Sequence, residues 1–219
     1  MDIRKNILDI YDKISALNSS VEIVAATKTR SLDDIKIALS TGKISAAGEN
    51  RVQELLSKFD AGVTWDFIGQ LQTNKVKYII DKVRLIHSVD RLNLAEVINS
   101  EAKKINKIQD ILIEINSGKE ENKGGIYLED ADAFLDKLSG FNNIRVRGMM
   151  AVAPLQYSQE ELQRTFDTVY ARYSLLKSDS FNYLSMGMSN DYLTAVKAGA
   201  NIIRLGRAIF GEREQWVTL

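Results

Sequence analysis

Cysteine is missing from the 219 residues of this chain, and histidine occurs only once, as His87. A chain without cysteine forms no disulfides and no thiolate-ligated metal site. A single histidine also argues against a histidine-rich metal centre, and against a serine–histidine–aspartate site built around several histidines. We therefore expect no bound metal.

Long apolar runs and an excess of one charge are missing as well. No stretch approaches the roughly 20 apolar residues of a membrane-spanning helix. Residues 1–5 include an acid and do not lead into a continuous apolar segment, unlike a signal peptide. The 29 basic and 29 acidic side chains cancel, so no overall field attracts nucleic acid or an anionic membrane. We expect a cytoplasmic protein with neither of these partners.

Proline is nearly absent too. The only one, Pro154, lies in a loop at residues 153–157, and no linker divides the chain. A length of 219 residues suits one large α/β domain or two small ones. We predict a single domain over residues 1–219.

What the chain does contain is a regular alternation of amphipathic helices and short apolar strands. The opening helix places Ile3, Ile7, Ile10, Ile14 and Leu17 on one face. Eight strand-like segments follow, at residues 21–27, 44–47, 65–68, 83–88, 110–115, 145–152, 183–186 and 201–205. Helical spacing recurs between them, at Leu92, Ala95, Ile98, Ala102 and Ile105, and again at Leu162, Phe166, Val169, Tyr173 and Leu176.

Eight strands that alternate with helices predict an α/β fold: a single (β/α)8 TIM barrel with an extra N-terminal helix. An open doubly wound sheet is the alternative, but it normally has fewer strands and a glycine-rich turn after the first. The corresponding turn here, at residues 27–30, has no glycine. The capping-box pattern of Ser31 and Asp34 predicts that a helix begins directly after this turn and ends before Gly42.

The most informative residue is Lys28, because it ends the first strand. The carboxyl ends of barrel strands form the active-site face of this fold. A lysine there is partly removed from water, which favours a neutral amine that can attack an aldehyde to form a Schiff base. Position alone leaves the alternative open, a solvated lysine without such a role.

The segments after the seventh and eighth strands, residues 186–191 and 204–211, combine glycines with polar side chains. Barrels often bind phosphate with these two loops, because glycine lets backbone N–H groups approach an anion. Ser189 adds a hydroxyl donor. Alternatively, Ser189 or Asn190 only caps the next helix, and Gly206 and Gly211 only form turns. Together with Lys28, the two loops favour a ligand with an aldehyde and a phosphate, such as pyridoxal 5′-phosphate (PLP).

Arg204 is predicted to point into the barrel. On an extended strand Ile202, Arg204 and Gly206 share one face, and Ile203 and Leu205 share the other. If the apolar pair faces the helices, the arginine faces the barrel mouth, where an unpaired buried charge is very costly. The pyridine nitrogen of PLP can accept a hydrogen bond from it, and an ion pair with a barrel carboxylate is the alternative.

Ordered motifs over nearly the whole chain resemble one family. They lie at residues 25–29, 48–50, 52–54, 67–75, 87–91, 123–125, 147–150, 185–189 and 204–211. Together they resemble the pyridoxal phosphate homeostasis protein family, which is related to the N-terminal barrel of alanine racemase. Positions 47, 66, 124 and 207 depart from the usual family pattern. Of these, Arg207 stands in place of a usual threonine or serine; it removes a hydroxyl but adds a cation, so binding of a phosphate should survive.

The resemblance implies a monomeric barrel with PLP bound to Lys28 as a Schiff base. It also implies phosphate contacts from Ser189 and from the backbone around Gly206 and Arg207, with Arg204 at the pyridine nitrogen. The cofactor-binding residues that follow are Lys28, Asn50, Met188, Ser189, Arg204, Gly206 and Arg207. No catalytic residue is implied.

The function implied by the resemblance is intracellular PLP (vitamin B6) homeostasis, with little or no turnover and with PLP-dependent apo-enzymes as possible recipients. The first alternative is a PLP-dependent amino-acid racemase, which needs an acid/base on each face of the Cα carbanion. Alanine racemases take one of these from a second domain, and we do not expect that domain in a chain that ends at Leu219. The other alternative is a Schiff-base aldolase that uses Lys28 without PLP.

His87 and Ser88 form the carboxyl end of the fourth predicted strand, and His87 is therefore expected at the rim of the barrel. There it either contacts a ligand or, in the interpretation that we favour, is hydrogen-bonded within the protein. Met149 and Met150 are expected to serve packing. Lys123 lies in a polar loop, and only the family resemblance makes it a candidate for a functional role.

Overall fold

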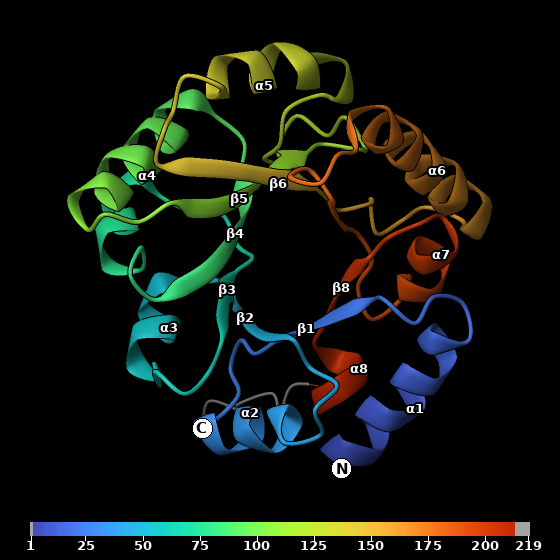
Figure 1. Cartoon of the computed structure of the whole chain (residues 1–219). Helices are drawn as coiled ribbons and strands as arrows, with labels where there is room; N and C mark the ends of the chain where they lie inside the picture. Colours follow the sequence, from blue (N-terminus) through green and yellow to red (C-terminus); the bar gives the residue numbers. More distant parts are fainter. Residues whose placement is uncertain (1, 213–219) are drawn as a thin grey trace.

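Eight parallel strands close into a barrel, and helices surround it (Figure 1). The computed structural model describes residues 2–212; Met1 and the last part of the predicted domain, residues 213–219, lie outside this range. The strands are β1 (Glu22–Ala26), β2 (Ala46–Glu49), β3 (Trp65–Phe67), β4 (Val83–Val89), β5 (Gln109–Ile115), β6 (Ile144–Ala151), β7 (Tyr183–Ser185) and β8 (Ile202–Leu205). They follow one another around the ring, and β1 pairs with β8 to close it. The predicted barrel with an N-terminal helix is confirmed.

The helices connect successive strands on the outside of the barrel. They are α1 (Ile3–Ser15), α2 (Leu32–Leu39), α3 (Val52–Ser57), α4 (Leu92–Lys104), α5 (Ala131–Leu138), α6 (Gln159–Leu176), α7 (Tyr192–Lys197) and α8 (Arg207–Phe210), with the 3₁₀ turns η1 (Thr73–Tyr78) and η2 (Leu128–Asp130). The capping box of Ser31 and Asp34 is present at the start of α2. Gly42 follows this helix with a φ of 67°, as its role as a stop requires.

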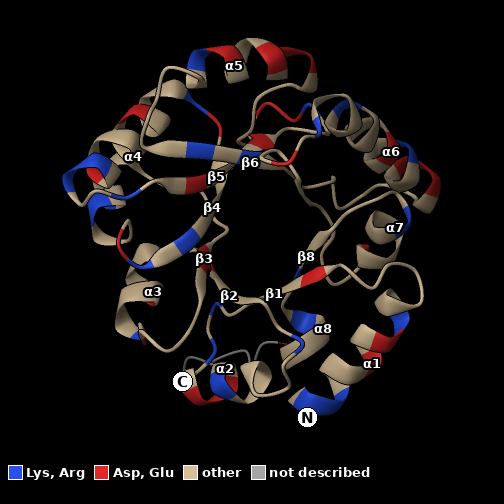
Figure 2. Cartoon of the chain, viewed as in Figure 1, with Lys and Arg blue, Asp and Glu red and all other residues tan. Residues whose placement is uncertain are grey.

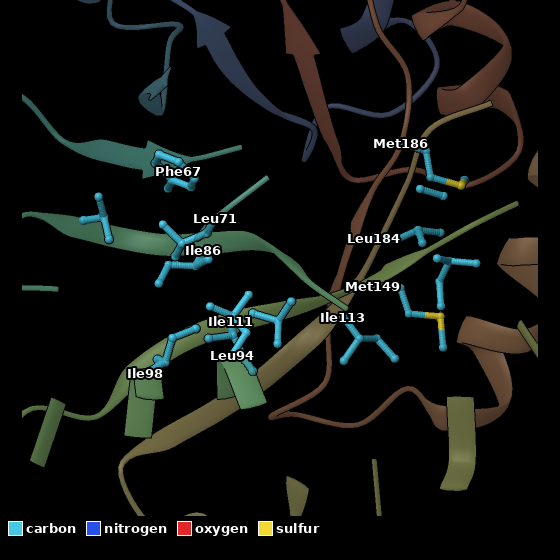
Figure 3. Packing of buried hydrophobic residues seen from close by; sticks show 14 of the residues in the cluster. Phe67, Leu71, Ile86, Leu94, Ile98, Ile111, Ile113, Met149, Leu184 and Met186 are labelled. Carbon is cyan, nitrogen blue, oxygen red and sulfur yellow. The ribbon is translucent and has the colours of Figure 1, made fainter. Parts of the chain in front are cut away.

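Most of the apolar core lies between the barrel and the helices. Figure 3 shows side chains from the outer face of the barrel packed together, with Leu94 and Ile98 of α4 beside Ile111 of β5. A second set of apolar residues fills the inside of the barrel: Val24, Ala46, Leu85, Leu112, Met150 and Ile202. Alternate residues of each strand therefore face different layers.

The N-terminal helix covers the place where the barrel closes. Ile7, Ile10 and Ile14 of α1 are buried in one cluster with residues of β1 and β8, among them Ile23 and Ile203. The helix that follows β8, α8, has only four residues. The longer α1 lies beside it and provides the apolar cover for both strands (Figure 1). Within residues 2–212, no helix combines the length and the apolar character needed to cross a membrane.

One strand is displaced from its predicted position. The apolar pattern predicts a strand at residues 44–47, whereas β2 spans Ala46–Glu49. Glu49 is fully buried because it forms an ion pair with Lys58, and this charged strand residue conceals the strand's end in the sequence. Gly48 and Glu49 thus belong to the barrel wall, and Asn50 is the first residue beyond it.

Charged residues gather at the amino ends of the strands. Figure 2 shows acidic positions on β1, β3 and β5 and basic positions on β4 and β6. They form ion pairs across strands: Arg84 with Glu22 and Asp66, and Arg145 with Asp110. This is the end of a barrel that serves stability rather than catalysis.

Candidate functional site

A cavity of about 670 Å³ opens at the carboxyl ends of β1, β7 and β8. Six of the seven predicted site residues line it: Lys28, Met188, Ser189, Arg204, Gly206 and Arg207. Asn50 ends up just after β2 and is not among the lining residues. The structure therefore brings together side chains from three strand ends that are far apart in the sequence.

Lys28 sits in a turn that is held from both sides. The next residue, Thr29, has a φ of 65°, which is unfavourable for a β-branched residue. Its backbone N–H donates to Oε2 of Glu54 at 2.8 Å. Lys58 donates to the carbonyl oxygens of Thr27, at 2.8 Å, and of Arg30, at 3.2 Å. These contacts fix the backbone before and after Lys28, which is half-buried at the cavity.

A buried ion pair lies beneath this turn. Nζ of Lys58 is 2.6 Å from Oε1 of Glu49, and the Thr27 hydroxyl donates to the same oxygen. Burial raises the pKa of Glu49, although the hydrogen bonds from Lys58 and Thr27 oppose the shift. Within residues 2–212, the other carboxylate oxygen of Glu49 is buried without a hydrogen-bond partner. The charge on Lys58 is thus the main compensation for a carboxylate inside the barrel wall.

The loop after β7 needs a glycine at its second position. Gly187 has a φ of 94°, and a Cβ added there would lie 2.7 Å from the Cβ of Ala195 and 2.9 Å from the Cα of Tyr192. Oδ1 of Asp191 accepts from the backbone N–H of Met188 at 2.5 Å and closes the loop. The sharp turn directs Met188 and the residue after it toward the cavity.

Ser189 joins this loop to the one after β8. Its Oγ accepts from the backbone N–H of Ala208 at 3.1 Å, and Oδ1 of Asn190 accepts from Arg207 at 3.0 Å. The N-cap residue of α7 is Asp191, so the alternative that Ser189 or Asn190 caps this helix is wrong. Because its oxygen accepts from Ala208, the Ser189 hydroxyl proton can be donated to a ligand.

Arg204 points into the barrel, as predicted from its strand. It is 4% exposed and donates to the carbonyl oxygen of Ser185 at 2.9 Å, to Oγ of Ser185 at 2.6 Å and to the carbonyl oxygen of Ala151 at 3.0 Å. In the part of the chain that the structure describes, no carboxylate forms an ion pair with it. Burial lowers the pKa of Arg204 to about 10, against the attraction of Glu114 and Asp191. The guanidinium stays charged at neutral pH.

His87 does not lie at the rim, so that prediction is wrong. The strand extends to Val89, and His87 shares the inward face of β4 with Leu85, where it is fully buried. Its Nδ1 is 3.1 Å from Oγ of Ser185, and its Nε2 is 3.2 Å from Oδ2 of Asp66. The favoured interpretation of a histidine hydrogen-bonded within the protein is confirmed.

Several cavity residues were not identified from the sequence: Ala26, Arg30, Leu155, Asn190, Asp191 and Glu212. Arg30 donates to the carbonyl oxygen of Gly211 at 2.7 Å. Its place in the sequence, two residues after Lys28, could have indicated that it lies near the site. Leu155 is 80% exposed at the cavity, and nothing in its loop distinguished it. Four cationic side chains and two acidic ones line the cavity, which favours an anionic ligand.

A smaller cavity of about 330 Å³ lies at the carboxyl end of β5. Glu114, Gln70, Lys123 and Gly124 are among its lining residues. Burial and the neighbouring charge of Asp90 raise the pKa of Glu114 to about 7. Lys123 forms an ion pair with Glu120, at 2.5 Å, so its charge is compensated locally.

The chain is similar in sequence to proteins of one kind. The family model of the alanine racemase N-terminal domain matches residues 2–214. A pyridoxal phosphate homeostasis protein from Aquifex aeolicus is 40% identical over 204 residues, which cover 88% of this chain and 87% of that protein. Another from Synechocystis sp. is 37% identical over 213 residues, which cover 93% of this chain and 97% of that protein.

A solved structure agrees with these sequences. PipY from Synechococcus elongatus PCC7942, determined with PLP bound, superposes on the chain with a TM-score of 0.84 and 30% sequence identity. The match covers 95% of this chain and all of PipY. The likeness therefore extends over the whole barrel, including the strand ends that surround the larger cavity.

Proposed function

The chain belongs to the pyridoxal phosphate homeostasis protein family, and we propose that it binds PLP in the cavity at the ends of β1, β7 and β8. Its function is to hold the cofactor for intracellular PLP (vitamin B6) homeostasis. The observation that carries the proposal is that Lys28, Ser189 and Arg204, from three separate strand ends, line one cavity. The bound PLP of PipY, a structure 30% identical, supports the same ligand here.

The residues present fit this cofactor. An aldehyde requires an amine, and Lys28 supplies it. A phosphate requires donors and positive charge, and Ser189 and Arg207 supply them. A pyridine nitrogen requires a donor, and Arg204 lines the same cavity with a guanidinium that is already held in place. A volume of about 670 Å³ lies within the range of small-molecule sites.

Lys28 forms the covalent link in this proposal. Its side-chain nitrogen would hold PLP through the aldehyde carbon, with the aldehyde oxygen released as water. When bound, PLP supplies an electrophilic carbon and a conjugated ring that can withdraw electrons. Arg204 donates hydrogen bonds and does not readily release its proton, so it does not protonate the ring nitrogen. The ring would then be a weak electron sink, which by itself does not separate storage from racemisation.

We propose that Asn50 approaches the cofactor from the end of β2, while Met188, Gly206 and the backbone of Arg207 complete the phosphate contacts. The protein acts as a monomeric single domain in the cytoplasm, and PLP-dependent apo-enzymes receive its cofactor. The exposed opening of the cavity, with Leu155 at its edge, supports release to another protein.

The decisive experiment combines absorbance with peptide mapping. Protein incubated with PLP and desalted should show the absorbance band of a protein Schiff base, and borohydride reduction should fix a pyridoxyl group on Lys28. Lys28→Ala should lose both signals. Lys104→Ala, a change in an exposed lysine of α4, should keep both. Wild-type protein without band or adduct would refute the proposal and favour an aldolase that uses Lys28 alone.

An assay with alanine and other amino acids separates storage from racemisation. The proposal expects no interconversion of enantiomers above a control without protein. Steady turnover that disappears in Lys28→Ala would instead show a PLP-dependent racemase.

A further inference from the structure

A continuous line of hydrogen-bonded side chains crosses the inside of the barrel. It begins at Arg204, at the cavity, and passes through buried residues of β7, β4 and β3 to the charged amino end of the strands. In order, the line consists of Arg204, Ser185, His87, Asp66, Arg84 and Glu22. The binding of PLP proposed above uses only its first member.

Each step is a direct contact. The Ser185 hydroxyl is 2.6 Å from Arg204 and 3.1 Å from His87, and His87 is 3.2 Å from Asp66. Arg84 binds Asp66 with two hydrogen bonds, of 3.0 and 2.8 Å, and reaches Glu22 at 3.0 Å. Ser185, His87 and Asp66 are fully buried, so water does not compete for these contacts.

The chemistry of the groups fixes where the protons lie. Arg204 only donates, so Oγ of Ser185 accepts from it. The hydroxyl proton of Ser185 is then left for Nδ1 of His87, which accepts it, and Nε2–H of His87 donates to Asp66. The opposite tautomer would direct a lone pair of His87 at the carboxylate and a second donor at Ser185.

Charges around the histidine keep this arrangement. Burial lowers the pKa of His87, an effect that Asp66 opposes and that Arg204 and Arg84 reinforce, so the ring is neutral. Burial disfavours the charged form of Asp66, but hydrogen bonds from His87 and Arg84 prevail and lower its pKa. A neutral imidazole between a carboxylate and a hydroxyl has only one favourable tautomer.

We propose that His87 and Asp66 are positioning residues for the cofactor: through Ser185 they fix the guanidinium of Arg204 in the orientation that meets the pyridine nitrogen of PLP. The inference rests on the proposed function. Asp66 selects the tautomer of His87, His87 orients the hydroxyl of Ser185, and this hydroxyl holds Arg204. Removing Asp66 or the acceptor nitrogen of His87 frees Ser185 to donate elsewhere, and Arg204 loses one of its anchors.

Two ligands distinguish this role from general support of the fold. PLP has the ring nitrogen, and its 1-deaza analogue has a C–H group in the same place, with the same aldehyde and phosphate. We expect wild-type protein to bind PLP more tightly than the analogue. Asp66→Asn and His87→Gln should weaken PLP binding about tenfold and change the dissociation constant of the analogue less than about twofold, because one oriented hydrogen bond is affected.

Arg145→Gln is the control variant. It removes an ion pair with Asp110 at the same end of the barrel but outside this line, and it should leave both dissociation constants unchanged. Equal losses for both ligands in Asp66→Asn and His87→Gln would show a structural role only and overturn the inference. So would unchanged binding of both ligands, or a wild-type protein that does not discriminate between them. Wild-type protein that binds neither ligand would instead refute the proposed function.

Discussion

Lys58 supports the candidate site although it is not part of it. Its ammonium group neutralises the buried Glu49 and donates to the carbonyl oxygens on both sides of Lys28. Removing one partner of a buried ion pair leaves the other charge without compensation, which is among the most costly single changes in a protein. At the residue scale, the position of Lys28 therefore depends on the charge of Lys58, the residue that directly follows α3.

Lys58→Met should lower the free energy of unfolding by about 3–5 kcal/mol. It should also weaken PLP attachment at temperatures where the variant is still folded, because the turn loses the hydrogen bonds from Lys58 to the carbonyl oxygens of Thr27 and Arg30. Urea unfolding and the absorbance of bound PLP measure the two effects. Lys36→Met, which breaks an exposed ion pair with Asp60, is the control and should resemble wild type. Equal stability of the two variants would contradict the role of Lys58.

Glu114 makes the free energy of unfolding fall as the pH rises. Its pKa in the folded protein is about 7, above the ordinary value of a glutamate. The folded state therefore binds this proton more tightly than the unfolded chain does. The stability that this provides is fully present below about pH 4.5 and is lost as the pH rises to 7.

Glu114→Gln removes this titration. Urea unfolding between pH 4.5 and 8 measures the effect. As the pH rises, the free energy of unfolding of the variant should increase by up to about 3 kcal/mol relative to that of wild type. A constant difference between the two proteins over this range would show that the carboxyl group has an ordinary pKa.

The sequence predicted where the side chain lies for some strand residues but not for others. The direction of Arg204 follows from strict alternation along β8, and that strand is regular. The depth of His87 in the barrel could not be predicted in the same way, because β4 continues to Val89 through an irregular register between Ile86 and Val89. A shift of this kind depends on pairing with β5, which no pattern within the strand reveals.

At the scale of elements, the loop after β7 determines where Ser189 lies. Gly187→Ala adds a methyl group against Ala195 and the backbone of Tyr192, at a positive φ. Since the contact with Tyr192 is with backbone, the loop or α7 has to move. We expect a loss of about 2–4 kcal/mol in unfolding free energy and weaker PLP binding.

Gly42→Ala is the matched control for this change. Gly42 also has a positive φ, of 67°, but an added Cβ meets no atom within 4 Å. Its cost should be the backbone strain alone, about 1 kcal/mol, with PLP binding unchanged. A cost for Gly187→Ala no greater than this would show that the loop accommodates the methyl group.

Elements with a strong apolar period were predictable, and the short ones were not. The helix around Leu92 and the long helix around Leu162 were identified because each buries one regular face. The elements α3 and η1, of six residues each, are too short to show a period, yet α3 leads to Lys58. The sequence therefore located the cavity through its strand ends, but it did not reveal the support behind Lys28.

At the scale of the whole molecule, α1 is the part that covers the closing seam of the barrel. Its buried isoleucines pack on β1 and β8, the strands that precede Lys28 and carry Arg204. Ile7→Ala should lower the unfolding free energy by about 2–4 kcal/mol, and bound PLP should be lost at the same urea concentration as helical structure. Leu8→Ala, a neighbouring change at a 45% exposed position, should have little effect on either. Loss of PLP well before the helical signal would show that the seam opens separately from the rest of the barrel.

The closure of the ring by its first and last strands also has a consequence for the protein's synthesis. Lys28 leaves the ribosome early, but it has no cofactor site until β8 is made and takes its place beside β1. A nascent or prematurely terminated chain therefore lacks Arg204 and the loop after β8, which in the proposed function contact PLP together with Lys28. Retention of PLP then reports that translation has passed Arg204 and that the two ends of the barrel have met.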